Sequence, residues 1–195
     1  MSTARQVLET SELLRECGDD ANRALSRRAE IVGLGVGKPF QRAGQLAAGT
    51  ALILEGRLRR VWNPPGREAL SLGTVEAGDW VGWGSVVRNA PDLTVIASRQ
   101  TRVVLIPLAE AQQALASHRS LRQALATPLL EELAVLLLPD LQRRGLRVEH
   151  PRDLLEEILP HTQLLAPPDP LPESHWLCYS GPARDGAPAI GTPLD

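Results

Sequence analysis

The feature that most constrains the fold is a series of short apolar segments between residues 31 and 107. Runs such as TALILEG (50–56) and LRRVW (58–62) are separated by glycine or proline at the intervals of about 8–12 residues that are typical of all-β domains. Asn63-Pro64-Pro65-Gly66 is predicted to be a loop between two strands, because proline cannot donate to a β-ladder. This part of the chain is therefore predicted to be β-rich.

Helical periodicity flanks the β-rich region on both sides. Residues 3–30 carry leucine and alanine at helical spacing, with a break at Gly18-Asp19-Asp20. The period returns after Pro107, and a further helix is expected after Thr127-Pro128, with the threonine as its N-cap. Another short helix is expected over Pro151–Leu159. The predicted parts are N-terminal helices (1–30), a β-domain with its closing helix (31–125), a helical extension (126–165) and a proline-rich tail (166–195).

One cassette within the β-rich region has a family resemblance. Gly78-Asp79-Trp80-Val81-Gly82 leads into a short helix, and Thr94-Val95-Ile96-Ala97 follows as a strand. This order resembles the phosphate-binding cassette of cyclic nucleotide-binding domains, and the resemblance covers about residues 5–125. It implies a mainly β fold, a double-stranded β-helix of the jelly-roll or β-roll type, with C-terminal helices and the proline-rich tail.

The resemblance also implies a ligand pocket, but two ligand positions depart from the family. The glutamate that accepts from the ribose is Trp83 here, and the phosphate-binding arginine is Pro91. Charge-assisted hydrogen bonds contribute about 1.5–3 kcal/mol each, so losing both lowers affinity by roughly two to four orders of magnitude. We therefore predict no cofactor, with cyclic nucleotide as the alternative ligand. The implied pocket residues are Gly82, Trp83, Gly84, Ser85, Arg88 and Thr94.

Two sets of side chains in the cassette allow two interpretations. Arg88 could turn inward as a substitute phosphate ligand, but a solvated cation at the helix end is favoured. Trp80 and Trp83 either fill the core, which is favoured in a chain with so few other aromatics, or form a ligand or partner surface.

The same segment resembles one subgroup of the family more closely. Gly82-Trp83, Val86-Val87-Arg88 and Pro91-Asp92 are similar to a pattern in the divergent domains at the N-terminus of some bacterial, especially cyanobacterial, peptide- or toxin-exporting ABC transporters. The resemblance implies a non-enzymatic regulatory or docking module whose partner is an ABC transporter or another protein.

Two other classes of function were considered and are disfavoured. A transcription regulator of the catabolite-activator type needs a C-terminal helix-turn-helix, whereas residues 151–195 offer one short acidic helix and then proline. A cupin-like enzyme needs clustered metal ligands, but the four histidines (118, 150, 161 and 175) are scattered. Gly33–Gly37 lacks the last glycine of a nucleotide loop, and His175 with Cys178 is not spaced as a catalytic couple. We predict neither catalytic nor metal-binding residues.

Charge and hydropathy limit the partners. A formal net charge of −2 predicts no nucleic-acid partner, and no apolar run approaches the roughly 20 residues of a membrane span. The expected location is the cytoplasm, with any membrane association through a partner. The helix after Pro128 carries a leucine stripe that either packs on the chain's own β-domain, the favoured interpretation, or forms the seam of a homodimer. A homodimer is nevertheless our expectation for assembly. Its seam candidates are Leu130, Leu133, Leu137 and Leu141.

Overall fold

The computed structural model describes residues 3–63, 68–88, 91, 93–134, 137–138, 141, 149–158, 176–178 and 192–194. The chain divides into two units, residues 1–132 and 133–195, and each is described by itself. The four-part division predicted from the sequence, with boundaries after 30, 125 and 165, stays a prediction. The predicted loop at 64–66 and the proline-rich linker at 166–172 lie outside the described residues.

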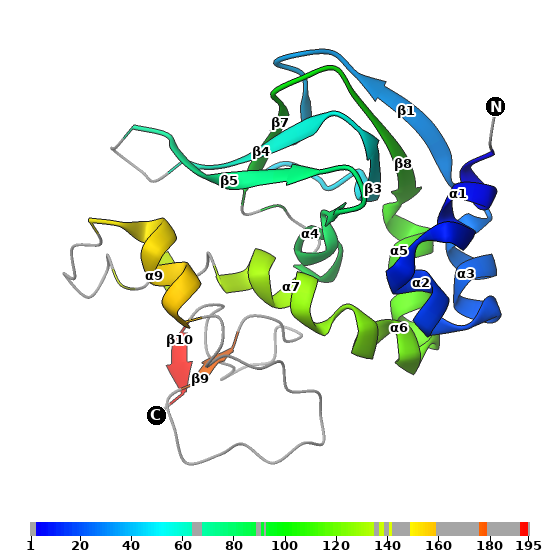
Figure 1. The fold of residues 1–195 in the computed structure, drawn as a ribbon. Helices are drawn as coiled ribbons and strands as arrows, with labels where there is room; N and C mark the ends of the chain where they lie inside the picture. Colours follow the sequence, from blue (N-terminus) through cyan, green and yellow to red (C-terminus); the bar gives the residue numbers. More distant parts are fainter. Residues whose placement is uncertain are drawn as a thin grey trace. The chain divides into compact units, whose positions relative to one another are not determined.

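The first unit is built on two four-stranded antiparallel sheets, with strand orders β1-β8-β3-β6 and β2-β7-β4-β5 (Figure 1). Their facing residues form an apolar core that includes Ile53, Leu58, Val95 and Val103. The predicted β-roll with flanking helices is confirmed. Its strands are β1 (Glu30–Leu34), β2 (Pro39–Gln41), β3 (Gly49–Glu55), β4 (Arg57–Trp62), β5 (Leu70–Glu76), β6 (Trp80–Val81), β7 (Thr94–Ala97) and β8 (Thr101–Pro107).

Helices cover one end of the roll, and three of them follow its last strand in the sequence. The N-terminal helices bury Leu8, Leu14 and Leu25 completely or nearly so, and the break predicted at Gly18 separates the second from the third. A further break at Ser11 was not predicted. The helices of this unit are α1 (Ala4–Thr10), α2 (Glu12–Cys17), α3 (Asp19–Ser26), α4 (Trp83–Arg88), α5 (Leu108–Ser117), α6 (Arg119–Ala124) and α7 (Ala126–Leu133).

The start of α7 differs from the sequence-based expectation. The helix begins at Ala126, so Thr127 is not its N-cap, and Pro128 lies within its first turn. Proline is tolerated there because the first N–H groups of a helix have no partner within the helix. The N–H of Leu129 donates to the carbonyl of Leu125 at 2.9 Å, so α7 follows α6 without a loop.

The second unit contains three described elements. Helix α9 (Pro151–Ile158) agrees with the predicted helix to within one residue. Strands β9 (Trp176–Cys178) and β10 (Thr192–Leu194) pair antiparallel. His175 lies outside the described residues.

The backbones of β3 and β8 approach each other closely at Gly49. Gly49 begins β3 with a φ of +150°, and a Cβ built on it would lie 2.0 Å from the carbonyl oxygen of Ile106 in β8. We predict that Gly49→Ala lowers the free energy of unfolding by about 3 kcal/mol, through steric overlap and backbone strain. Urea denaturation measures this change.

Gly33→Ala is the matched control, because a Cβ at Gly33 meets nothing within 4 Å and its φ is not positive. That variant should stay within about 1 kcal/mol of the wild type. Equal stability of the two variants would contradict the steric overlap assigned to a Cβ at Gly49.

Candidate functional site

The site is centred on the turn between β6 and α4, where the sequence predicted a cassette. Gly82 adopts a φ of +93°, and a Cβ there would lie 2.7 Å from the carbonyl oxygen of Gly49. Only glycine fits both the left-handed conformation and this contact. The chain then enters α4 at Trp83, and the N–H of Val86 donates to the carbonyl of Gly82 at 3.0 Å. The first N–H groups of α4 are thereby left for another acceptor.

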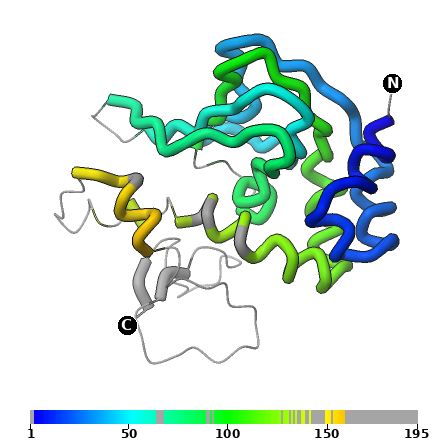
Figure 2. Tube along the Cα trace, viewed as in Figure 1, coloured from blue at the N-terminus to red at the C-terminus, as the bar shows by residue number. Residues whose placement is uncertain are grey.

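That acceptor is the carboxylate of Glu132, which the sequence analysis did not single out. The N–H of Gly82 donates to Oε1 and the N–H of Gly84 donates to Oε2, both at 2.7 Å. Glu132 lies near the end of α7, about 50 residues further along the chain, and Figures 1 and 2 show α7 passing beside α4. A carboxylate is favoured at this place because backbone N–H groups and the helix dipole both attract negative charge.

The environment of Glu132 perturbs its ionisation. Burial raises its pKa from 4.5 to about 7, although the N–H groups of Gly84 and Gly82 and the positive charge of Arg60 lower it. The residue as a whole keeps some exposure, so the carboxylate rather than the entire side chain is enclosed. Near neutral pH the group is thus poised between its two protonation states.

Arg60 is the second side chain that sequence reasoning missed. It lies on β4 two residues after buried Leu58, so both side chains point to the inner face of the sheet. Its partner across the ladder is Gly73, and a Cβ on that glycine would lie 3.5 Å from Nη2 of Arg60. The Nε of Arg60 is buried without a hydrogen-bond partner among the described residues. The arginine therefore supplies positive charge within the roll.

Little space remains beside the cassette. The cavity between α4 and the inner faces of β4 and β7 has a volume of about 10 Å³, roughly the space of one water molecule. Its lining residues are Gln41, Arg60, Val81, Gly84, Ser85, Leu93, Val95 and Glu132.

The predicted pocket residues mostly have partners within the fold. Ser85 donates to Oε1 of Gln41 at 3.1 Å. Thr94 accepts from the N–H of Ala43 and from the side-chain amide of Asn63, both at 3.1 Å. These hydroxyl groups connect the cassette to the neighbouring β2 and β4 segments.

The side chains of Trp80 and Trp83, and part of the Arg88 guanidinium group, are buried. Trp83 is completely buried and Trp80 is 8% exposed, with their ring centroids 5.6 Å apart. Nε1 of Trp80 also donates to the hydroxyl of Ser11 at 3.3 Å. The Nε and Nη1 atoms of Arg88 are buried, whereas the residue as a whole is partly exposed, so its guanidinium group is not the fully solvated helix-end cation that was favoured. Arg88 does not line the small cavity beside the cassette.

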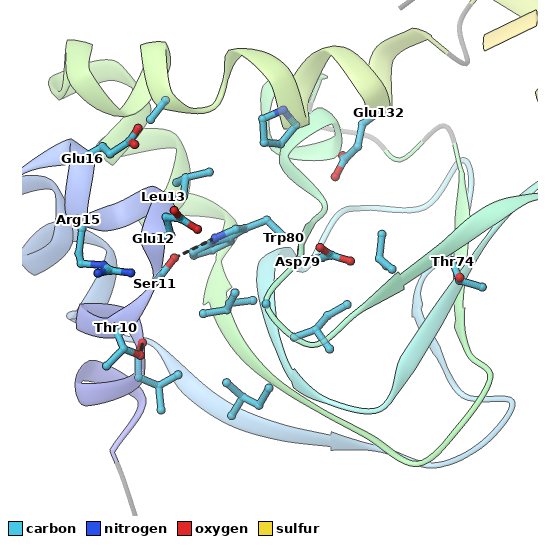
Figure 3. A pocket seen from close by; sticks show the side chains of 18 of the residues that line it. Thr10, Ser11, Glu12, Leu13, Arg15, Glu16, Thr74, Asp79, Trp80 and Glu132 are labelled. Atoms are coloured by element: carbon cyan, nitrogen blue, oxygen red, sulfur yellow. Dashed lines mark hydrogen bonds between the residues drawn. The ribbon is translucent and has the colours of Figure 1, made fainter. Parts of the chain in front are cut away.

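A larger cavity of about 810 Å³ lies on the other side of Glu132. Figure 3 shows side chains of α2 on one side, Asp79 and Trp80 in the middle, and Glu132 reaching in from α7. Charged groups from α2, β4, the β5–β6 turn and α7 face this space: Glu12, Arg15, Glu16, Arg60, Asp79 and Glu132.

Neither a group of metal ligands nor a membrane-spanning helix is present among the described residues. In that part of the chain, no three histidine, cysteine, aspartate or glutamate side chains are grouped as metal ligands would be. Nor does any helix there combine the length and hydrophobicity needed to cross a membrane.

Comparison with known proteins supports the fold. No protein-family model and no curated protein matches the sequence. Among solved structures, the regulatory domain of Toxoplasma gondii PKA, co-crystallised with cAMP, is 17% identical with a TM-score of 0.56, over 63% of this chain and 46% of that one. The regulatory subunit of a cAMP-independent protein kinase A from Trypanosoma cruzi, bound to guanosine, is 12% identical with a TM-score of 0.56, over 81% and 50%.

A bacterial structure matches over most of its own length. The sensor domain of the transcriptional regulator DNR from Pseudomonas aeruginosa is 15% identical with a TM-score of 0.53, over 72% of this chain and 91% of that one. By contrast, this chain spans about half the length of the two kinase regulatory chains. The β-roll described above is the fold of cyclic nucleotide-binding domains.

The raised pKa of Glu132 predicts a pH dependence of stability. Because the folded pKa of about 7 lies above the ordinary 4.5, this group contributes stability below pH 4.5 that is lost as the pH rises through 7. The free energy of unfolding of the wild type, relative to Glu132→Gln, should therefore increase from about pH 8 to about pH 5. Urea denaturation across this range measures it. A difference that is constant, or that shrinks toward acid pH, would contradict the environment assigned to Glu132.

Proposed function

We propose that this chain is a non-enzymatic regulatory or docking module that works without cyclic nucleotide. The observation that carries this proposal is the position of the Glu132 carboxylate. It accepts hydrogen bonds from the N–H groups of Gly82 and Gly84, which flank the start of α4. In the cassette that this segment resembles, such groups hold the cyclic phosphate. Here the carboxyl group of Glu132, a side chain of the chain itself, satisfies them.

The volume beside the cassette supports the same conclusion. Pockets for small ligands and cofactors are generally about 300–1,000 Å³, whereas the space next to Gly84 and Ser85 is about 10 Å³. The completely buried indole of Trp83 stands at the position of the ribose-binding glutamate, and Pro91 stands at that of the arginine. A cyclic nucleotide would thus have to displace Glu132 and would still lack its two charged contacts.

The partner part of the proposal rests on the sequence resemblance. The Gly82-Trp83 and Val86-Val87-Arg88 pattern supports a link to an ABC exporter, with this chain in the cytoplasm and no nucleic-acid partner. The alternative of a cyclic-nucleotide-responsive sensor predicts binding heat with cyclic AMP or cyclic GMP. The alternative of a transcription regulator of the catabolite-activator type predicts that the chain shifts duplex DNA on a gel at physiological salt.

Calorimetry tests the central part of this proposal. We predict that cyclic AMP and cyclic GMP give no binding heat with the wild-type chain. The Glu132→Gln variant should not gain affinity for either, because Trp83 and Pro91 still replace the two ligand residues. Micromolar or tighter binding to the wild type would overturn the proposal. Arg60→Ala and Arg88→Ala would then show which arginine contacts the phosphate.

Assembly gives a second prediction, a homodimer through the helix that follows the roll. Leu130, Leu137 and Leu141 are partly exposed, while the side chain of Leu133 lies outside the described residues. Burying four leucines contributes about 6–12 kcal/mol before association costs. We expect a dimer in sedimentation at several micromolar, and Leu133→Glu should dissociate it with the roll still folded. A wild-type monomer at that concentration would contradict the seam.

A further inference from the structure

Helix α7 spans a hollow instead of lying flat on the roll. Ala124, Pro128 and Glu132 recur at intervals of four residues, so they form one stripe along α6 and α7. All three line the 810 Å³ cavity. The stripe of Pro128 and Glu132 on α7 therefore meets open space, whereas Leu129 between them in the sequence is buried. The position of α7 is set by Leu129 and by contacts at its two ends.

The first end is anchored by ordinary packing. Leu121 and Leu125 are buried to within 1%, and the hydroxyl of Ser120 donates to the carbonyl of Cys17 at 2.7 Å. These contacts attach α6 to α2. The other end is held by the two hydrogen bonds from Gly82 and Gly84 to Glu132. One side chain thus connects the far end of α7 to the cassette.

We propose that α7 is a latch, in which the Glu132 carboxylate holds the helix over the cavity and, when released, exposes the N–H groups of Gly82 and Gly84. This inference rests on the proposed function, because it identifies how a cassette without cyclic nucleotide is controlled. The helix takes the place of a ligand, and breaking two hydrogen bonds at one residue releases it.

Burial of the Glu132 carboxyl group makes the latch sensitive to pH, and charged groups on four elements share its surroundings. Arg60 faces it from β4 and Asp79 from the β5–β6 turn, while Glu12, Arg15 and Glu16 face the same cavity from α2. The docked group holds its proton more tightly than a solvated glutamate, since its pKa is about 7 instead of 4.5. Docking is consequently favoured as the pH falls toward 4.5 and weakens as the pH rises through 7.

Hydrogen exchange measures the latch in the full chain. In Glu132→Gln the amide group can replace only one of the two acceptor oxygens, so one N–H of the cassette loses its partner. We expect the peptides that contain Gly82, Gly84 and residues 126–133 to exchange about ten- to a hundredfold faster than in the wild type. Exchange in β3 and β8 should stay unchanged.

Glu9→Gln is the matched control, because it also removes one helical carboxylate. Glu9 is exposed and pairs with Arg5 on α1, away from the cassette. This variant should exchange as the wild type does. Unchanged protection of residues 126–133 in a folded Glu132→Gln variant would overturn the latch, and so would an equal effect of Glu9→Gln.

A pH titration of the wild type gives an independent readout that does not depend on how the variant folds. The backbone amide resonances of Gly82 and Gly84 should shift together with a midpoint near 7, the pKa of Glu132. Amide resonances of Gly82 and Gly84 that do not follow the titration of Glu132 at any pH would overturn the latch. The two proposals fail separately: binding of cyclic nucleotide to the wild type contradicts the proposed function, whereas these exchange and titration results contradict only the latch.

Discussion

The arrangement of α7 beside the cassette depends on one interaction, the pair of hydrogen bonds that the Glu132 carboxylate accepts from the N–H groups of Gly82 and Gly84. Backbone N–H groups at the start of a helix need an acceptor, and a short helix packed inside a domain has little access to water. Supplying the acceptor from α7 satisfies the cassette and fixes the path of α7 at once. The hydrogen bonding of the cassette and the position of α7 therefore depend on the same side chain.

The geometry around this contact is set by glycine. Gly82 must have a positive φ and must lie against the backbone of Gly49, which itself lies against β8 at Ile106. This chain of close approaches fixes where α4 begins relative to the two sheets. Trp83 and Trp80 then fill the volume behind the turn. The space that a small ligand would require is consequently taken up by the chain's own side chains.

Local patterns predicted the β-rich region, and the family resemblance predicted the place of the cassette, but neither predicted the group that fills it. The break at Gly18 follows from helix start and stop signals, whereas the turn at Gly82 and the strand Thr94–Ala97 were expected from the resemblance. Glu132 lies about 50 residues from its partners, in a helix where a glutamate looks like a surface residue. Arg60 was equally hard to predict, because LRRVW contains two adjacent arginines and only the strand register shows which one points inward.

The most direct test is a crystal structure of the chain grown at acid to neutral pH with millimolar cyclic AMP. The account predicts electron density for the Glu132 carboxylate within hydrogen-bonding distance of the N–H groups of both Gly82 and Gly84, with no nucleotide beside α4. Glu132 turned toward solvent, with a cyclic phosphate bound at the start of α4, would contradict it.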